Sequence, residues 1–174
     1  MGIASGVGSW DHLTVLLIEK AYGGTWTIVP FNSGGEAAAA LLGGHIDTGI
    51  FGLAGAADPS KFKFLVHTGA RQVPELPGVP SFSELGQSSL AISANSGAFV
   101  KIETDPAIVK TLQEAFMKAA NEPGFKKWAK DTRTPIGEPF DAKAWEEFLL
   151  NSDQRITEIL PIMEKSIKQM QGGK

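Results

Sequence analysis

Two short turns rich in glycine and serine are the segments of this sequence best suited to bind a ligand. The first turn comprises Gly6, Val7, Gly8 and Ser9, and the second comprises Ser33, Gly34 and Gly35. Each turn precedes a segment with helical spacing of apolar residues, so each places backbone amides at a helix N-terminus, where the macrodipole adds about half a positive charge. Glycine lets a ligand approach the backbone closely, and a serine hydroxyl can donate a hydrogen bond. This pattern favours a bound anion such as a carboxylate.

Each turn taken alone is also a common way to start a helix, since a serine N-cap after glycine usually binds no ligand. The binding interpretation depends on both turns together. If the strands before them are neighbours in a parallel sheet, both helices start at the carboxyl edge of that sheet, where ligands of open α/β sheets bind. Phe51 and Gly52 follow a third expected strand and could line the same cleft. Alternatively, these two residues only pack against the protein at the end of that strand.

Other kinds of site have less support in the sequence. The chain has no cysteine, and His12, His45 and His67 are not spaced like zinc ligands. The first turn is neither a Walker loop nor a complete dinucleotide fingerprint. A hydrolase that uses Ser9 or Ser33 with His12 is an alternative, although the glycine after the serine of a nucleophile elbow is missing. We expect His12 to pack or cap, and we predict no catalytic residue, no metal and no cofactor.

Composition indicates a soluble globular chain of one domain or two small lobes. The 174 residues are 43% hydrophobic and 20% charged, and the formal net charge is -3. This balance argues against nucleic acid as a partner, because binding to phosphates needs clustered Lys and Arg. The start, "MGIASGVGSW", lacks the basic residues and long apolar run of a signal peptide. No stretch is long and apolar enough to span a bilayer.

Apolar periodicity and turn residues predict an α/β lobe over residues 1–103, followed by a helical segment over residues 104–174. Expected strands cover residues 25–31, 45–53 and 62–69, with one or two more within 89–102, and three prolines make residues 73–86 irregular. Expected helices begin at the caps Ser9, Ser33, Thr104 and Asp141, and another covers residues 123–131. Gly23 should end the first helix, and Pro161 should kink or end the last one.

Several segments in order resemble one family over nearly the whole chain. "GVGSWDHL" resembles the G-x-G-S-x-x-H-L turn of the tripartite tricarboxylate transporter substrate-binding proteins, also called the Bug family. "VPFNSGGEAAAALLGGHIDTGIFGL" is similar to the segment of that family with a glycine pair, A-L-L-G-G and a V-D strand. "RQVPELPGVPSFSELG" is similar to its R-x-x-x-L-P-x-V-P signature, and residues 104–131 resemble its late helices.

The resemblance implies a fold, a function and a location. Members are extracytoplasmic solute receptors with a two-lobed clamshell fold of the periplasmic-binding-protein type II kind, in which a mostly parallel sheet is flanked by helices. They deliver small carboxylates, such as tricarboxylates and dicarboxylates, to a membrane permease, which implies a periplasmic location. Full members are longer, so the resemblance implies the second lobe, with residues 104–174 packing on a first lobe. Without that lobe, we expect the exposed C-terminal helices to form a homodimer.

The resemblance also implies which residues bind the ligand. The family's ligand loops map onto residues 6–9 and 33–35, where amides and hydroxyls hold a carboxylate, partly through water. The "SGGEA" version looks nearest to the tricarboxylate branch. Many members carry Asp-Asn or Glu in the loop after the V-D strand, whereas this chain has Phe51, Gly52, Leu53 and Ala54 there. A ligand-sensing domain of a transcription regulator, which uses a similar two-lobed fold, is the alternative function.

Overall fold

The structure is a computed structural model that describes residues 1–69, 72–92 and 95–172. The chain divides into two compact units. Unit 1 comprises Met1–Ala94 and Pro161–Lys174, and unit 2 comprises Asn95–Leu160. None of the described helices combines the length and apolar character needed to cross a membrane.

A parallel sheet lies at the centre of unit 1. Its strands are β1 (Gly2–Ile3), β2 (Val29–Pro30) and β3 (Gly49–Ile50), in the spatial order β2-β1-β3. The amide of Phe31 donates to the Ile3 carbonyl over 2.9 Å, and the amide of Gly2 donates to the Thr48 carbonyl over 2.8 Å. β1 is two residues long and central, so its neighbours pair over no more than that length. The strands expected at 25–31 and 45–53 are therefore present but shorter than predicted.

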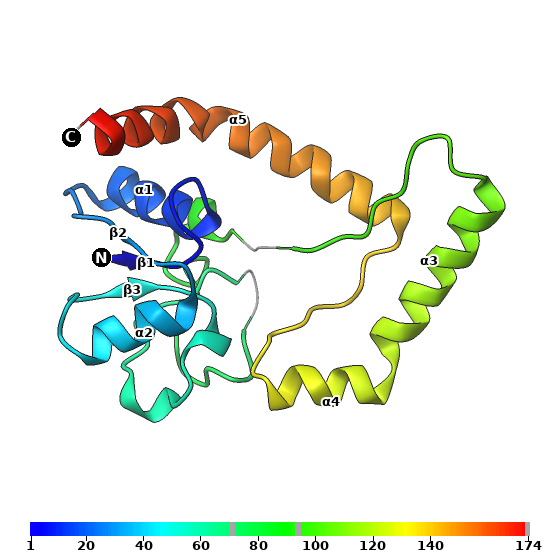
Figure 1. Cartoon of the computed structure of the whole chain (residues 1–174), viewed down its shortest axis with the longest axis horizontal. Coiled ribbons are helices and arrows are strands. Elements are labelled where there is room, and N and C mark those ends of the chain that lie inside the picture. Colours follow the sequence, from blue (N-terminus) through cyan, green and yellow to red (C-terminus); the bar gives the residue numbers. More distant parts are fainter. Residues whose placement is uncertain (70–71, 93–94, 173–174) are drawn as a thin grey trace. The chain divides into compact units, whose positions relative to one another are not determined.

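Two helices cover the two faces of this sheet (Figure 1). α1 (Trp10–Tyr22) lies on one face and α2 (Gly34–Leu42) on the other. Ile3 of β1 and Val15 of α1 are fully buried, and so is Ala37 on the apolar side of α2. Helices that flank a parallel sheet confirm the predicted α/β fold class.

The helix boundaries follow the predicted caps. The Ser9 hydroxyl accepts from the amide of His12 over 3.3 Å, and the Ser33 hydroxyl accepts from the amide of Glu36 over 3.2 Å. α1 ends at Gly23, whose φ of 75° a residue with a side chain rarely adopts. These three predictions are confirmed, because a cap depends only on residues within one turn of the helix.

The strand predicted at residues 62–69 is wrong. These residues form one isolated parallel bridge, between His67 and Ser81. Extending the bridge toward Phe64 would need an amide hydrogen at Pro80, which proline lacks. Extending it the other way would need the amide of Glu84, which donates instead to the Ser81 hydroxyl over 3.1 Å.

The segments around this bridge are short single turns. They are the 3₁₀ helices η1 (Leu53–Gly55), η2 (Pro59–Lys61) and η3 (Ser88–Leu90). The strands predicted within residues 89–102 are wrong in the described part of that segment, and residues 93–94 lie outside the described residues. The amides of Leu90, Ala91 and Ile92 donate to carbonyls two or three residues earlier, so they cannot pair with a strand.

Unit 2 is helical. It contains α3 (Pro106–Asn121), α4 (Pro123–Asp131) and the first part of α5 (Ala142–Gly172), whose remainder, from residue 161, belongs to unit 1. α4 matches the prediction, and so does the cap at Asp141, whose carboxylate accepts from the amide of Ala144 over 2.8 Å. Thr104 is not the cap of α3, because the neighbouring Asp105 carboxylate accepts from the amide of Ala107 over 2.7 Å. α5 does not end at Pro161, since one missing amide hydrogen removes only one helical bond.

The apolar stripe of α3 is uncovered. No residue of α3 is buried, and Ile108, Leu112 and Phe116 are 54%, 36% and 56% exposed. Aromatic packing in unit 2 lies elsewhere, where Trp145 stacks on Phe148 with ring centroids 5.4 Å apart. The spacing of the apolar residues predicted an amphipathic helix correctly, but it does not show whether another segment covers the apolar side.

A close backbone contact yields a stability prediction. A Cβ atom on Gly55 would lie 2.8 Å from the carbonyl carbon of Gly34 at the start of α2, whereas a Cβ atom on Gly52 would meet nothing within 4 Å. We expect Gly55→Ala to lower the free energy of unfolding by about 1–3 kcal/mol through overpacking. Gly52→Ala should change it by less than about 0.5 kcal/mol. Urea denaturation measures both, and equal effects of the two variants would contradict the contact.

Candidate functional site

The three predicted ligand segments leave the sheet at the same edge. Residues 4–9 follow β1, residues 31–35 follow β2, and residues 51–52 follow β3. Because the strands are parallel and adjacent, their carboxyl ends lie together. Both flanking helices also start at this edge (Figure 1). The chain thus brings the helix starts of α1 and α2 to one side of the sheet.

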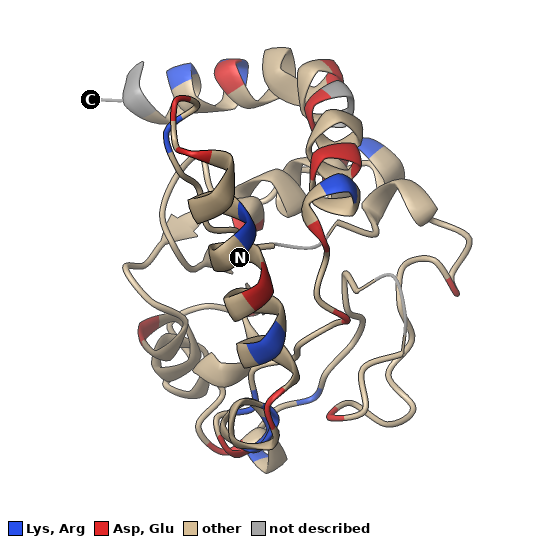
Figure 2. Ribbon diagram, turned by 90° about the vertical axis from the view of Figure 1, so that its right-hand side faces the viewer, with Lys and Arg blue, Asp and Glu red and all other residues tan. Residues whose placement is uncertain are grey.

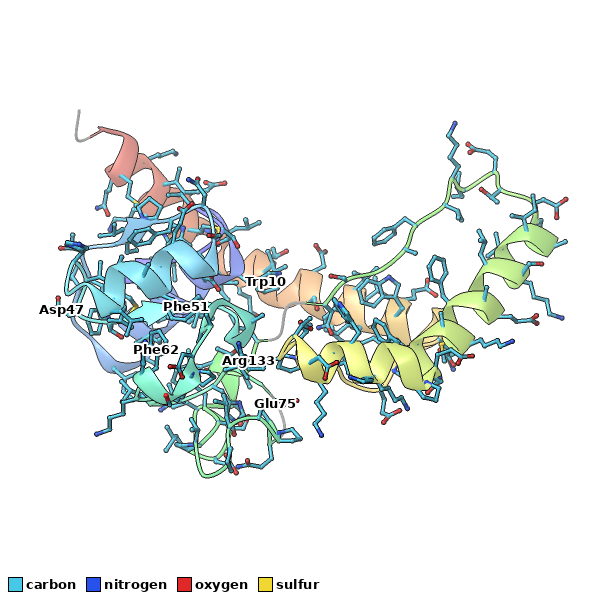
Figure 3. All side chains as sticks on the ribbon, turned by 60° about the horizontal axis from the view of Figure 1, so that its bottom comes forward. Trp10, Asp47, Phe51, Phe62, Glu75 and Arg133 are labelled. Atoms are coloured by element: carbon cyan, nitrogen blue, oxygen red, sulfur yellow. The ribbon has the colours of Figure 1, made fainter. Side chains whose placement is uncertain are left out.

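The second turn and the loop after β3 are in contact. A Cβ atom on Gly34 would lie 3.3 Å from the Cα of Gly55 and 3.5 Å from the Cβ of Phe51. Phe51 is half-buried and meets Phe62 edge to face, with ring centroids 6.2 Å apart (Figure 3). This loop therefore contributes an aromatic wall beside the start of α2. Gly52 is exposed at the same place.

The amides of the two turns differ in what they bind. In the described part of the chain, no hydrogen bond links the amides of Gly6 or Val7 to a protein acceptor. The amides of Gly34 and Gly35 belong to the first turn of α2 and have no acceptor within that helix. Gly8 differs, because its amide donates to Nδ1 of His12 over 3.1 Å. Four amides are thus available to an anion, and the Gly8 amide is not.

His12 is a structural residue, as expected. Its side chain is fully buried, and its Nε2 lies 3.1 Å from the hydroxyl of Ser166 in α5. Burial lowers the pKa of His12 below 6.5, and the charge of Glu19 opposes this only in part, so the ring is neutral at neutral pH. Sequence reasoning could not find Ser166, because 154 residues separate it from His12.

The two serine hydroxyls also differ. The Ser9 hydroxyl donates to the Ala4 carbonyl over 3.3 Å and accepts from the amide of His12, so both of its roles are filled. The Ser33 hydroxyl accepts from Glu36 and is exposed, and no described group accepts its hydrogen. Neither hydroxyl contacts the ring of His12, whose nitrogens meet Gly8 and Ser166. This geometry gives the hydrolase alternative no support.

Acidic side chains accompany both helix starts. Burial raises the pKa of Asp11, in the first turn of α1, to about 6, and a hydrogen bond from the Ala4 backbone opposes part of that rise. Glu36, in the first turn of α2, accepts from the amide of Asn32 over 3.1 Å. Among the described residues, no three metal-ligating side chains gather. Figure 2 shows that both acidic and basic residues are distributed over the helices.

The pKa of Asp11 predicts a pH dependence of stability. The folded carboxyl keeps its proton up to about pH 6, whereas the unfolded one loses it near 3.8. The folded state therefore binds more protons in this window, and the free energy of unfolding should fall as the pH rises from 4 to 6.

Asp11→Asn removes this contribution. We expect the variant to gain stability relative to the unaltered chain as the pH rises, as measured by urea denaturation at the two ends of the window. Asp47→Asn, at an exposed position, serves as the control. A stability difference between Asp11→Asn and the unaltered chain that stays constant with pH would contradict the raised pKa.

Comparison with known proteins identifies the family. A sequence model of the tripartite tricarboxylate transporter family receptors matches residues 3–161. The chain therefore belongs to this family of receptors.

Two curated relatives agree with this assignment. One, named "UPF0065 protein in gbd 5'region", is from Cupriavidus necator and is 31% identical over 119 residues, which are 66% of this chain and 36% of the relative. The other, named "UPF0065 protein in clcB-clcD intergenic region", is from Pseudomonas knackmussii and is 27% identical over 131 residues, 73% of this chain and 78% of the relative. The chain thus spans about a third of the length of the first relative.

Proposed function

We propose that this chain is one lobe of a periplasmic solute receptor that captures a small organic carboxylate and delivers it to a membrane permease. The observation that carries the proposal is the arrangement of two helix starts, with uncommitted amides, at one edge of a parallel sheet. Membership of the receptor family supports the same function. Capture needs no bond-making step, since binding between two lobes shifts the population toward a closed form.

The proposed ligand contacts come from backbone more than from side chains. The amides of Gly6, Val7, Gly34 and Gly35 and the hydroxyl of Ser33 are the donors, directly or through water. Phe51 and Gly52 line the side of the site, and Phe51 offers the ligand carbon atoms an apolar surface. A tricarboxylate or dicarboxylate would present one carboxylate here and another to an opposing lobe. By itself, this chain should therefore bind such a ligand weakly.

A charge placed at the start of α2 tests the carboxylate assignment. Gly35 has room for a side chain, since an added Cβ would meet only the Ser33 hydroxyl, at 3.9 Å. An aspartate there stabilises the helix start but repels an anion, so Gly35→Asp should weaken citrate binding about tenfold or more. Gly35→Asn has the same shape without the charge and should change affinity by less than about threefold. Isothermal titration at low salt measures both variants.

The difference in citrate affinity between these two variants tests whether an anion binds at the start of α2. Equal affinities of Gly35→Asp and Gly35→Asn for citrate would contradict an anion at this helix start. Tight binding of citrate by the chain alone would contradict the need for an opposing lobe. Citrate is the probe because it carries three carboxylates, and acetate, with one, should bind more weakly.

We also propose that the exposed helices associate in a homodimer. The uncovered side of α3, with Ile108, Leu112 and Phe116, supports this association. Phe116→Glu should shift the chain toward the monomer, and Gln113→Glu, which adds the same charge at another exposed position of α3, should not. Light scattering over a concentration series measures the mass. A monomer at every concentration would contradict the proposal.

A further inference from the structure

A chain of two hydrogen bonds joins the first turn to the C-terminal part of α5. The Gly8 amide lies 3.1 Å from Nδ1 of His12, and the Ser166 hydroxyl lies 3.1 Å from Nε2 of the same ring. All three residues belong to unit 1. The imidazole is fully buried, so water does not compete for its nitrogens.

These contacts determine the tautomer of the ring. A backbone amide can only donate, so Nδ1 of His12 must be the acceptor. A neutral imidazole then carries its hydrogen on Nε2, and that hydrogen points to the Ser166 hydroxyl. Ser166 therefore stabilises the one tautomer that can accept from Gly8.

The hydrogen bond from Gly8 to His12 matters more to the first turn, residues 6–9, than to helix α1. Gly8 is exposed and has a φ of 88°, and His12 is the described group that holds its amide. The start of α1 has its own cap, because the Ser9 hydroxyl accepts from the amide of His12. Loss of the ring contacts should thus loosen residues 6–9 without unwinding α1.

We infer that Ser166 is a positioning residue for the ligand turn. Through His12 it fixes residues 6–9 and holds the Gly8 amide in a hydrogen bond to the ring. The amides of Gly6 and Val7 are left for the carboxylate. The part of this inference that concerns the ligand rests on the proposed function. Its consequence is that the docking of α5, from residue 161 onward, controls the affinity of a site formed near the other end of the chain.

Amide hydrogen exchange in the ligand-free chain tests the positioning role. Ser166→Ala should speed exchange at Gly8 about three- to tenfold, as expected for one weakened hydrogen bond. Ser166→Thr keeps the hydroxyl and should restore the exchange rate at Gly8, and Leu17 inside α1 should exchange equally in all three proteins. Unchanged exchange at Gly8 in Ser166→Ala would overturn the inference. A side-chain nitrogen spectrum that places the ring hydrogen of the unaltered chain on Nδ1 would also overturn it.

Citrate titration of the same three proteins tests the effect on the ligand. Affinity should fall about threefold or more in Ser166→Ala and return in Ser166→Thr. If Gly8 exchange responds but Ser166→Ala binds citrate like the unaltered chain, control of the ligand site is wrong. If Gly8 exchange responds and none of the proteins binds citrate, the proposed function fails while the positioning of the turn stands.

Discussion

The parallel pairing of β1 with both of its neighbours sets the geometry of unit 1. β1 is two residues long, yet it lies between β2 and β3 and fixes their direction. Parallel strands need a crossover after each one, and α1 and α2 serve as those crossovers. All three strand ends, and both helix starts, therefore lie at one edge. Without this pairing, the two turns would be separate helix caps that could not share the proposed ligand.

The edge combines groups used by the protein with groups left for a ligand. His12 accepts a hydrogen bond from the Gly8 amide, and the Ser9 hydroxyl makes two hydrogen bonds within the protein. The shape of the first turn is therefore set by its own contacts. The second turn keeps an exposed Ser33 hydroxyl whose hydrogen no described group accepts. Under the proposed function, a backbone-based site of this kind would recognise a carboxylate by charge and direction rather than by one charged side chain. Membership of the transporter receptor family fits such a site.

Local features could be predicted from the sequence, and contacts between distant segments could not. The caps at Ser9 and Ser33 and the whole of α4 depend on neighbouring residues, and they match. The alternation over residues 62–69 predicted a strand, but Pro80 beside it cannot continue a ladder. The link from His12 to Ser166 gave no signal, since one serine on a helix looks like any other. The resemblance predicted the family, whereas only the structure shows which amides donate to an acceptor within the protein.

If uncommitted amides at two neighbouring helix starts bind one carboxylate, citrate should perturb those amides more than any others. Backbone amide chemical shifts, recorded along the chain as citrate is added, report this for each residue. Binding at the sheet edge predicts the largest changes at Gly6, Val7, Gly34 and Gly35, with a smaller change at Gly8. Largest changes at the lysines of α4, or no change at the carboxyl edge of the sheet, would contradict a carboxylate bound between the two helix starts.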